Sequence, residues 1–423
     1  MPREHQSHDP HRWLVFAVMS TVYFFVYFHR VSPSVIAPDL LAAFQTHATA
    51  LGFMSSMYFY LYGLEQPLVG QFSDTLGPRR VVGFWSLIAT LGCIIFALAP
   101  TIGWAAVGRG FIGLGVGGVY VPAMKAFSQW FHEREFALMT GLLLAAGNLG
   151  AMVATTPLAW MAKLWGWRAS FVLIGGITLG LAFATLFMLR DHEAPSEPMR
   201  EQGTCNNKRD TGPRSSSLRV LASLRFWTVA AIFFGFFGVY LTFQGLWATP
   251  FIMSILKLDA LHASGLNMLI PVGFILGAPL SGWVSDRIFR ARVDMILSLL
   301  VLMTGAWAIL SFACPVLTTG GMTALLIIIG GVAGGFGTNL WTLVREITPG
   351  RILGLTSGLL NIFPLLGPAI LQIVTGAILD RTGMIDGMYP PAAYRDAFLV
   401  CLLIIAGCLA LCVLLRKQLR RKD

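Results

Sequence analysis

The feature that most constrains this chain is a series of long apolar runs, because one helical crossing of a membrane takes roughly 20 apolar residues. Twelve such runs occur in the 423 residues, at 13–38, 50–70, 80–99, 103–127, 136–159, 169–189, 226–254, 263–283, 293–313, 321–344, 352–378 and 395–415. Only 12% of the residues are charged, against about a quarter in soluble proteins. The sequence therefore predicts an all-α membrane protein with twelve transmembrane helices and no second soluble domain.

The positions of the basic residues predict the orientation of the chain. If the N-terminus is cytoplasmic, 22 of the 30 lysines and arginines fall in cytoplasmic segments. Cytoplasmic loops carry an excess of Lys and Arg, so both termini are expected in the cytoplasm. The protein is expected in the cell membrane, which is the inner membrane if the cell is bacterial. This bias explains the net charge of +10 without nucleic acid as a partner.

Signals for catalysis or cofactor binding are missing from the sequence. The six cysteines form no CxxC pair, and His5, His8 and His11 lie in a polar tail where solvation is the simpler interpretation. No Walker glycine loop followed by Lys-Ser/Thr is present. We therefore expect a protein that is not an enzyme and binds no metal or cofactor. Its expected partners are the lipid bilayer and a small molecule, and we expect a monomer.

The chain divides into two similar halves. A polar, Pro/Ser-rich stretch at 190–225 has six apolar runs on each side, which predicts bundles at 1–189 and 226–423 joined by a cytoplasmic linker at 190–225. The sequence from Gly70 to Asp74, followed by Arg79 and Arg80, is repeated from Gly282 to Asp286-Arg287. The two aspartates are 212 residues apart, about half the chain, as a duplication of six-helix halves would give.

This loop after the second span, its weaker copy after the eighth and the division into six and six spans resemble the major facilitator superfamily (MFS). The resemblance covers nearly the whole chain and implies two pseudo-symmetric bundles around a cavity that opens alternately to each side. Helices one, four, seven and ten would line that cavity. Three residues depart from the family pattern: Thr75 replaces a basic residue, Pro78 displaces the arginines by one place, and Phe289 stands where glycine is usual.

A short loop with one aspartate and several arginines can form a charge-assisted latch between neighbouring helices. We assign this role to Gly70, Asp74, Arg79, Arg80, Asp286 and Arg287. The alternative is that the arginines only mark the cytoplasmic side, and both interpretations can hold together.

Arg30 is the clearest charged residue inside a predicted span, where a charge is costly and by default functional. It lies 17 residues after Trp13, about 25 Å along the first helix, and guanidinium groups bind carboxylates and phosphates with two parallel hydrogen bonds. The sequence Tyr27-Phe28-His29-Arg30 resembles the organic-anion and sugar-phosphate permeases of the family, which implies an anion anchor at Arg30. The alternative is a structural ion pair.

Two more cations fall within the fourth span. Arg109 and Lys125 are 16 residues apart, which places them on nearly opposite sides of a straight helix. Arg109 matches the family's fourth-helix arginine, for which structural, substrate and proton-linked roles are open. Lys125 either faces the cavity, if Pro122 bends the helix, or reaches toward the cytoplasmic end.

Polar residues in other spans complete the predicted site. Ser55, Tyr58, Tyr62 and Glu65 share one face of the second helix by their spacing, so Tyr58 and Tyr62 are expected in the cavity wall. Glu65 either carries a proton or pairs with Arg79 or Arg80. Gln244 and Asn339 are expected to form the opposite wall. His29, Glu65 and Arg109 are the candidates for proton coupling.

The predicted function is proton-coupled uptake of a small organic anion, such as a carboxylate, by alternating access. No second arginine occurs on the seventh helix, which argues against a strict sugar-phosphate exchanger. The alternatives are a proton-coupled exporter of drugs or siderophores, an organic-anion exchanger, and a receptor-like or scaffold membrane protein.

Overall fold

A computed structural model describes residues 10–191, 220, 223–289, 291–313, 316–385 and 387–420, so most of the linker predicted at 190–225 lies outside the described residues. The first half contains α1 (His11–Phe44), α2 (Ala48–Leu76), α3 (Pro78–Ala97), α4 (Ile102–Gly117), α5 (Tyr120–Trp130), α6 (Glu133–Val153) and α7 (Thr156–Met188). The second half contains α9 (Leu224–Thr242), the π-helical turn η2 (Phe243–Trp247), α10 (Ala248–Leu256), α11 (Ala260–Asn267), α12 (Leu269–Ile288), α13 (Arg292–Ala308), the π-helical turn η3 (Ile309–Ala313), α14 (Thr319–Ile347), α15 (Gly350–Leu360), α16 (Phe363–Thr382) and α17 (Pro391–Arg420).

The prediction of an all-helical, multi-pass membrane protein is confirmed. Within the described ranges, eleven helical segments are long and apolar enough to cross a membrane. The expected second span, α2, is 29 residues long but falls outside that set. Its polar side chains lower its mean hydropathy, and Ser55, Tyr58, Tyr62 and Glu65 among them are buried inside the protein. The least apolar span therefore carries a large share of the interior polar groups.

The fourth, fifth, eighth and eleventh predicted spans are each divided between two helices. The fourth span consists of α4 and α5, which are separated at Gly118 and Val119. The fifth and sixth spans meet within α7, where Gly166 has a φ of +80°, a conformation that glycine adopts without a steric penalty. The helix pattern was therefore predicted correctly, whereas the breaks inside these spans were not.

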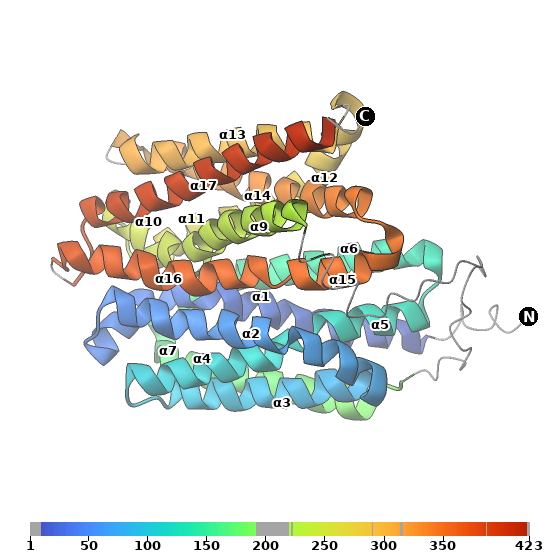
Figure 1. Ribbon diagram of the computed structural model, residues 1–423. Helices are drawn as coiled ribbons and strands as arrows, with labels where there is room; N and C mark the ends of the chain where they lie inside the picture. Colours follow the sequence, from blue (N-terminus) through green and yellow to red (C-terminus); the bar gives the residue numbers. More distant parts are fainter. Residues whose placement is uncertain are drawn as a thin grey trace, which may run out of the picture.

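The helices run roughly parallel in two groups (Figure 1). We call α1–α7 the N-terminal bundle and α9–α17 the C-terminal bundle. The start of α1 and the end of α17 lie at the same end of the molecule, at the right of Figure 1, and the connection between α16 and α17 lies at the opposite end. We call these the inner end and the outer end.

The two bundles contact each other in the outer half of the molecule. Ser34 on α1 and Thr249 on α10 share a hydrogen bond of 3.3 Å between their hydroxyls, and the Asn267 amide on α11 donates to the Ser34 hydroxyl at 3.4 Å. At the inner end, the salt bridges of the described residues stay within one bundle: Arg12–Glu135, Lys125–Asp74, Arg292–Asp286, Arg292–Glu346 and Arg416–Asp294. The bundles are therefore joined at the outer end.

Candidate functional site

Arg30 lies at the centre of a group of tyrosines. Its guanidinium carbon is 4.4 Å from the ring centroid of Tyr27. Its charge also acts on the phenol of Tyr58, whose hydroxyl donates to the Val26 carbonyl at 2.9 Å. Tyr62 and Tyr23 also interact electrostatically with Arg30. The Arg30 side chain is partly exposed, and it takes part in no salt bridge within the described ranges.

Helical spacing explains how the N-terminal bundle builds this group. Tyr23, Tyr27 and Arg30 are four and three residues apart on α1, so they share one face. Tyr58 and Tyr62 are four residues apart on α2, and their rings lie 5.9 Å apart. Residue 113 on α4 must be glycine for this arrangement, because a Cβ there would lie 2.2 Å from the Tyr58 carbonyl oxygen.

The C-terminal bundle closes the group from the other side. Tyr240 on α9 interacts electrostatically with Arg30 and Tyr27, and its phenol lies close to Gln244 one turn further on. Gln244 lies in η2, and π-helical turns occur frequently at functional sites. The same turn touches α1, since a Cβ on Gly245 would be 2.9 Å from the Arg30 carbonyl oxygen. The structure thus brings the predicted Gln244 wall next to Arg30.

We name this group the Arg30 cluster and define it as Arg30, Tyr23, Tyr27, Tyr58, Tyr62, Tyr240 and Gln244. It contains one permanent positive charge, phenol hydroxyls that can donate or accept, and one amide. Such a set suits an oxyanion whose charged end meets the guanidinium. Sequence reasoning missed Tyr23, Tyr27 and Tyr240, although their helical spacing from Arg30 and Gln244 was a usable signal.

Arg109 lies behind this cluster. It is fully buried, its guanidinium carbon is 5.0 Å from the Tyr58 ring centroid, and its three side-chain nitrogens have no hydrogen-bond partner among the described residues. Tyr58 therefore contacts two cations, Arg30 and Arg109. This position agrees with the expectation that Arg109 and Lys125 do not share one ligand.

His29 is next to Arg30 in the sequence but faces a different part of the bundle. It is fully buried, and its Nε2 is 3.7 Å from the Cys93 sulfur on α3. Its ring also lies 6.2 Å from that of Phe171 on α7. As a coupling candidate, His29 is thus placed in the bundle core rather than beside the anion anchor.

Lys125 was expected in the substrate site, and the structure places it elsewhere. Its ammonium is 2.7 Å from the Asp74 carboxylate and donates to the Ser73 carbonyl at 2.9 Å. The long side chain reaches toward the inner end instead of bending into the cavity. The second of the two alternatives for Lys125 is therefore the one that the structure contains.

Asn339 is also separated from the Arg30 cluster. Its amide donates to the Gly335 carbonyl at 2.8 Å and to the Ser281 hydroxyl at 3.2 Å. These contacts join α14 to α12 inside the C-terminal bundle. A buried amide near the middle of a helix therefore has a packing role here, which its sequence position alone did not reveal.

The predicted pairing of Glu65 with Arg79 or Arg80 is wrong. The Glu65 carboxylate accepts a hydrogen bond of 2.7 Å from the Trp85 indole. Arg79 instead donates to the Leu186 carbonyl at 2.8 Å, and Arg80 is exposed.

The duplicated loops hold helices of the same bundle together. Asp74 pairs with Lys125, so the first loop joins α2 to α5 and not to the nearby arginines. In the second copy, Asp286 and Glu346 each lie 2.8 Å from Arg292. Arg287 lies 5.0 Å from the Trp283 ring centroid, and a Cβ on Gly70 would meet no neighbour. Among the described residues of the two loops, none therefore bridges the two bundles.

A cross-bundle contact at the outer end was not predicted. Asp380 near the end of α16 accepts the backbone N–H groups of Ala48 and Thr49, at 2.9 and 2.8 Å, and also the Thr49 hydroxyl. The Tyr389 hydroxyl donates to Asp380. Burial, followed by the contact with Asp380, raises the pKa of Tyr389, so its hydroxyl keeps its proton at neutral pH. We call Asp380, Tyr389, Ala48 and Thr49 the outer clasp.

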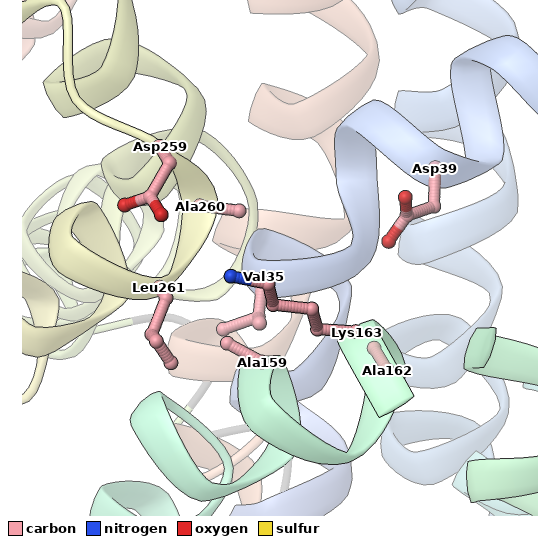
Figure 2. Close-up of a pocket in the computed structure, with 8 residues that line it drawn as sticks. All are labelled: Val35, Asp39, Ala159, Ala162, Lys163, Asp259, Ala260 and Leu261. Carbon is pink, nitrogen blue, oxygen red and sulfur yellow. The ribbon is translucent and has the colours of Figure 1, made fainter. Parts of the chain in front are cut away.

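A cleft of about 300 Å³ lies between the bundles at the outer end. Figure 2 shows Lys163 extending between α1 and the start of α11, with Asp39 and Asp259 on its two sides. Hydrogen bonds from the backbone and side chain of His262 lower the pKa of Asp259, so this carboxylate stays ionised. The cleft is therefore a polar outer recess, whereas the Arg30 cluster lies deeper along α1.

Comparisons with known proteins identify the family. The model of the Major Facilitator Superfamily matches residues 19–370 and 248–422. The chain is 26% identical over 391 residues to a probable sulfoacetate transporter of Cupriavidus necator, covering 89% of each chain. It is 26% identical over 421 residues to a probable L-galactonate transporter of Escherichia coli, covering 94% of this chain and 88% of that protein.

A solved structure supports the fold. The chain resembles a bacterial homologue of the human lysosomal transporter Spinster, in an inward-facing and unoccupied conformation, with a TM-score of 0.75, 17% identity and coverage of 97% of this chain and 98% of that chain. At this level of identity the likeness concerns the fold alone. The helices, the duplicated loops and the match over most of the sequence lead to one conclusion: the chain is a multi-pass secondary transporter that belongs to the Major Facilitator Superfamily.

Proposed function

We propose that this transporter takes up a small organic anion, most simply a carboxylate, together with protons. The observation that carries the proposal is the Arg30 cluster, a partly exposed guanidinium in the middle of α1 with no carboxylate paired to it in the described ranges. An unpaired charge inside a membrane protein costs several kcal/mol. A carboxylate of the substrate would offset that cost.

The phenols around Arg30 favour a substrate that bears hydroxyl or other oxygen groups. Tyr58, Tyr62 and Tyr240 surround the guanidinium from both bundles. The Tyr58 hydroxyl donates to the Val26 carbonyl at 2.9 Å, so toward a substrate it can only accept, whereas a phenol without such a partner can donate or accept. The names of the two relatives, sulfoacetate and L-galactonate transporters, describe oxygen-rich carboxylates. This agreement supports the class of substrate and leaves its identity open.

Alternating access gives the cluster a route to each side in turn. The outer clasp is formed and the inner salt bridges of the described residues lie within single bundles, which supports the proposal that the partly exposed Arg30 is reached from the inner end. We propose that both termini are cytoplasmic, following the positive-inside bias, so this is the inward-facing state. Opening the outer clasp while the inner ends approach would expose the same cluster to the outside.

Binding and uptake measurements test this proposal. Purified protein in detergent is first screened by thermal shift against carboxylates, sulfonates, phosphates, neutral sugars and cationic drugs. We expect the anions, and sulfoacetate or a sugar acid among them, to raise the melting temperature, and Arg30→Ala to remove the shift. Stabilisation only by cationic drugs or neutral sugars would refute anion recognition and favour the exporter.

Proteoliposomes then test the direction and the coupling. We expect uptake of the selected radiolabelled anion to rise with an inward proton gradient and to collapse with a protonophore. Uptake that ignores the gradient and requires internal anion would identify an exchanger instead, which overturns the coupling but retains the anion site.

A further inference from the structure

Glu65 is a buried carboxyl group with a single hydrogen-bond donor. It is 3% exposed, its Oε2 accepts from the Trp85 indole at 2.7 Å, and its Oε1 is buried with no hydrogen-bond partner among the described residues. It also takes part in no salt bridge there. An ionised carboxylate in such surroundings is costly, so the neutral, protonated form is favoured.

The carboxyl group is packed against the break between α4 and α5. A Cβ at Gly117 would lie 1.8 Å from Oε1 of Glu65, and one at Gly118 would lie 2.1 Å from the Trp85 ring. The Gln66 amide donates to the Gly117 carbonyl at 3.2 Å, so α2 also binds the backbone at this break. Ionising Glu65 requires water or new donors, which cannot enter without moving these helices.

The helix after the break leads to two other functional groups. Tyr120 begins α5, and its ring lies 5.6 Å from that of Tyr23 in the Arg30 cluster. Further along α5, Lys125 pairs with Asp74. A shift at the break is thus transmitted both to the anion site and to the inner loop.

Glu65 is also close to the anion site through its own helix. Tyr62 is one turn before it and interacts electrostatically with both Arg30 and Glu65. Tyr62 is the titratable group that faces Glu65 from α2. Trp85 from α3, Gly117 at the end of α4 and Gly118 in the break after it do not titrate, so no other side chain in these contacts takes up the proton.

We propose that Glu65 carries the proton that accompanies the anion, an inference that rests on the proposed function. The proton binds Glu65 while the cavity faces outward and leaves it in the inward-facing state once the helices at the α4–α5 break move and admit water, with no covalent step. Because binding linkage is reciprocal, an anion that favours the protonated form must itself bind more tightly when Glu65 is protonated. In this scheme the fully buried His29, which faces Cys93, is not needed.

The first test needs no substrate. Trp85 donates to Glu65, so its fluorescence should change as Glu65 titrates, and the difference between wild type and Trp85→Phe isolates that signal. We expect a pH-dependent difference spectrum that disappears in Glu65→Gln. A difference spectrum that is independent of pH in the wild type would overturn the role of Glu65, whether or not the transporter takes up an organic anion.

The second test uses sulfoacetate in proteoliposomes. Gln can accept the Trp85 hydrogen bond but cannot release a proton, so Glu65→Gln should retain sulfoacetate exchange within about three-fold and lose at least ten-fold of gradient-driven accumulation. Glu135→Gln, a partly exposed carboxylate paired with Arg12, is the matched control and should accumulate as wild type. Gradient-driven accumulation that survives Glu65→Gln would overturn the proposal.

The two tests separate this inference from the proposed function. Suppose that the Trp85 signal titrates but the protein neither binds nor transports organic anions. The proposed anion transport would then be refuted, while Glu65 would remain a proton-binding site. Anion uptake that depends on Arg30 but not on Glu65 would refute Glu65 as the proton carrier and retain the proposed anion transport.

Discussion

The carboxylate of Asp380 accepts the backbone N–H of Ala48 at 2.9 Å, so a residue of the C-terminal bundle caps a helix of the N-terminal bundle. The first backbone N–H groups of a helix have no partner within the helix, and α2 receives no side-chain cap from its own N-cap residue, His47. When the bundles separate at the outer end, the hydrogen bonds between these N–H groups and the Asp380 carboxylate break, and water must solvate both. The outer clasp therefore ties the first turn of α2 to the closed outer end.

Asp380→Asn should weaken the outer clasp. An amide retains one acceptor oxygen but loses the negative charge that favours the helix N-terminus, and loss of a cap costs about 1 kcal/mol. We expect the outward-open population to rise about five-fold. An Ala37→Cys reporter, which is buried on α1, in a background lacking Cys205 and Cys314, should then react faster with an impermeant maleimide added from outside.

Asp396→Asn is the control for this measurement, since Asp396 is an acid at the outer start of α17 whose salt bridge is to the neighbouring Arg395. It should leave the reaction rate unchanged. Equal maleimide rates for Asp380→Asn and wild type would show that the clasp does not hold the outer end closed.

The sequence predicted the helices and the shared face of Tyr58 and Tyr62, whereas the role of Arg30 as anion anchor stays a prediction. Apolar length predicted the spans, and helical spacing placed Tyr58 and Tyr62 on one face. The tyrosines Tyr23 and Tyr240 were missed because phenols are common in apolar helices, so their polar end carries no strong signal until a partner is seen.

The other misses share a physical cause, namely that spacing along a helix does not determine how far a side chain reaches or which helix it meets. Lys125 has a long flexible chain that extends one or two turns to Asp74. Asn339 is satisfied by Ser281 of a neighbouring helix. The outer clasp joins residues about 330 positions apart, which no local pattern contains.

Tyr240→Phe should weaken anion binding without affecting folding. The change removes only the hydroxyl that contacts Gln244 beside Arg30, and a neutral hydrogen bond contributes about 0.5–1.5 kcal/mol. We expect the Kd of the selected anion, measured by calorimetry, to rise about two- to ten-fold. Tyr394→Phe, a buried tyrosine of α17 that packs against Phe251, should bind as wild type. A rise of the same size in both variants would indicate a general packing effect.

Asp74 and Lys125 should act as one unit. Each of Asp74→Asn and Lys125→Gln breaks the 2.7 Å pair, so each should slow transport several-fold while the anion Kd stays within about three-fold. Stability should change little because the Asp74 carboxylate is exposed and Lys125 is partly exposed. In a double-mutant cycle the second substitution should add no further loss. Additive losses of transport, or a large rise in the anion Kd for Lys125→Gln, would contradict the paired role and indicate that Lys125 binds substrate.

Arg30→Lys is the sharpest test of anion recognition. Lysine keeps the charge but loses the planar fork that binds a carboxylate with two hydrogen bonds and stacks on Tyr27. Because a hydrogen bond to a charged group contributes about 1.5–3 kcal/mol, we expect the anion Kd to rise at least ten-fold and uptake at matched expression to fall accordingly. Arg30→Ala should abolish uptake. Arg168→Lys is the matched control, since this arginine stacks on Trp167 and donates to the Ala99 carbonyl far from the cluster. Wild-type anion affinity in Arg30→Ala would rule out the anchor, because no other residue of the cluster carries a positive charge.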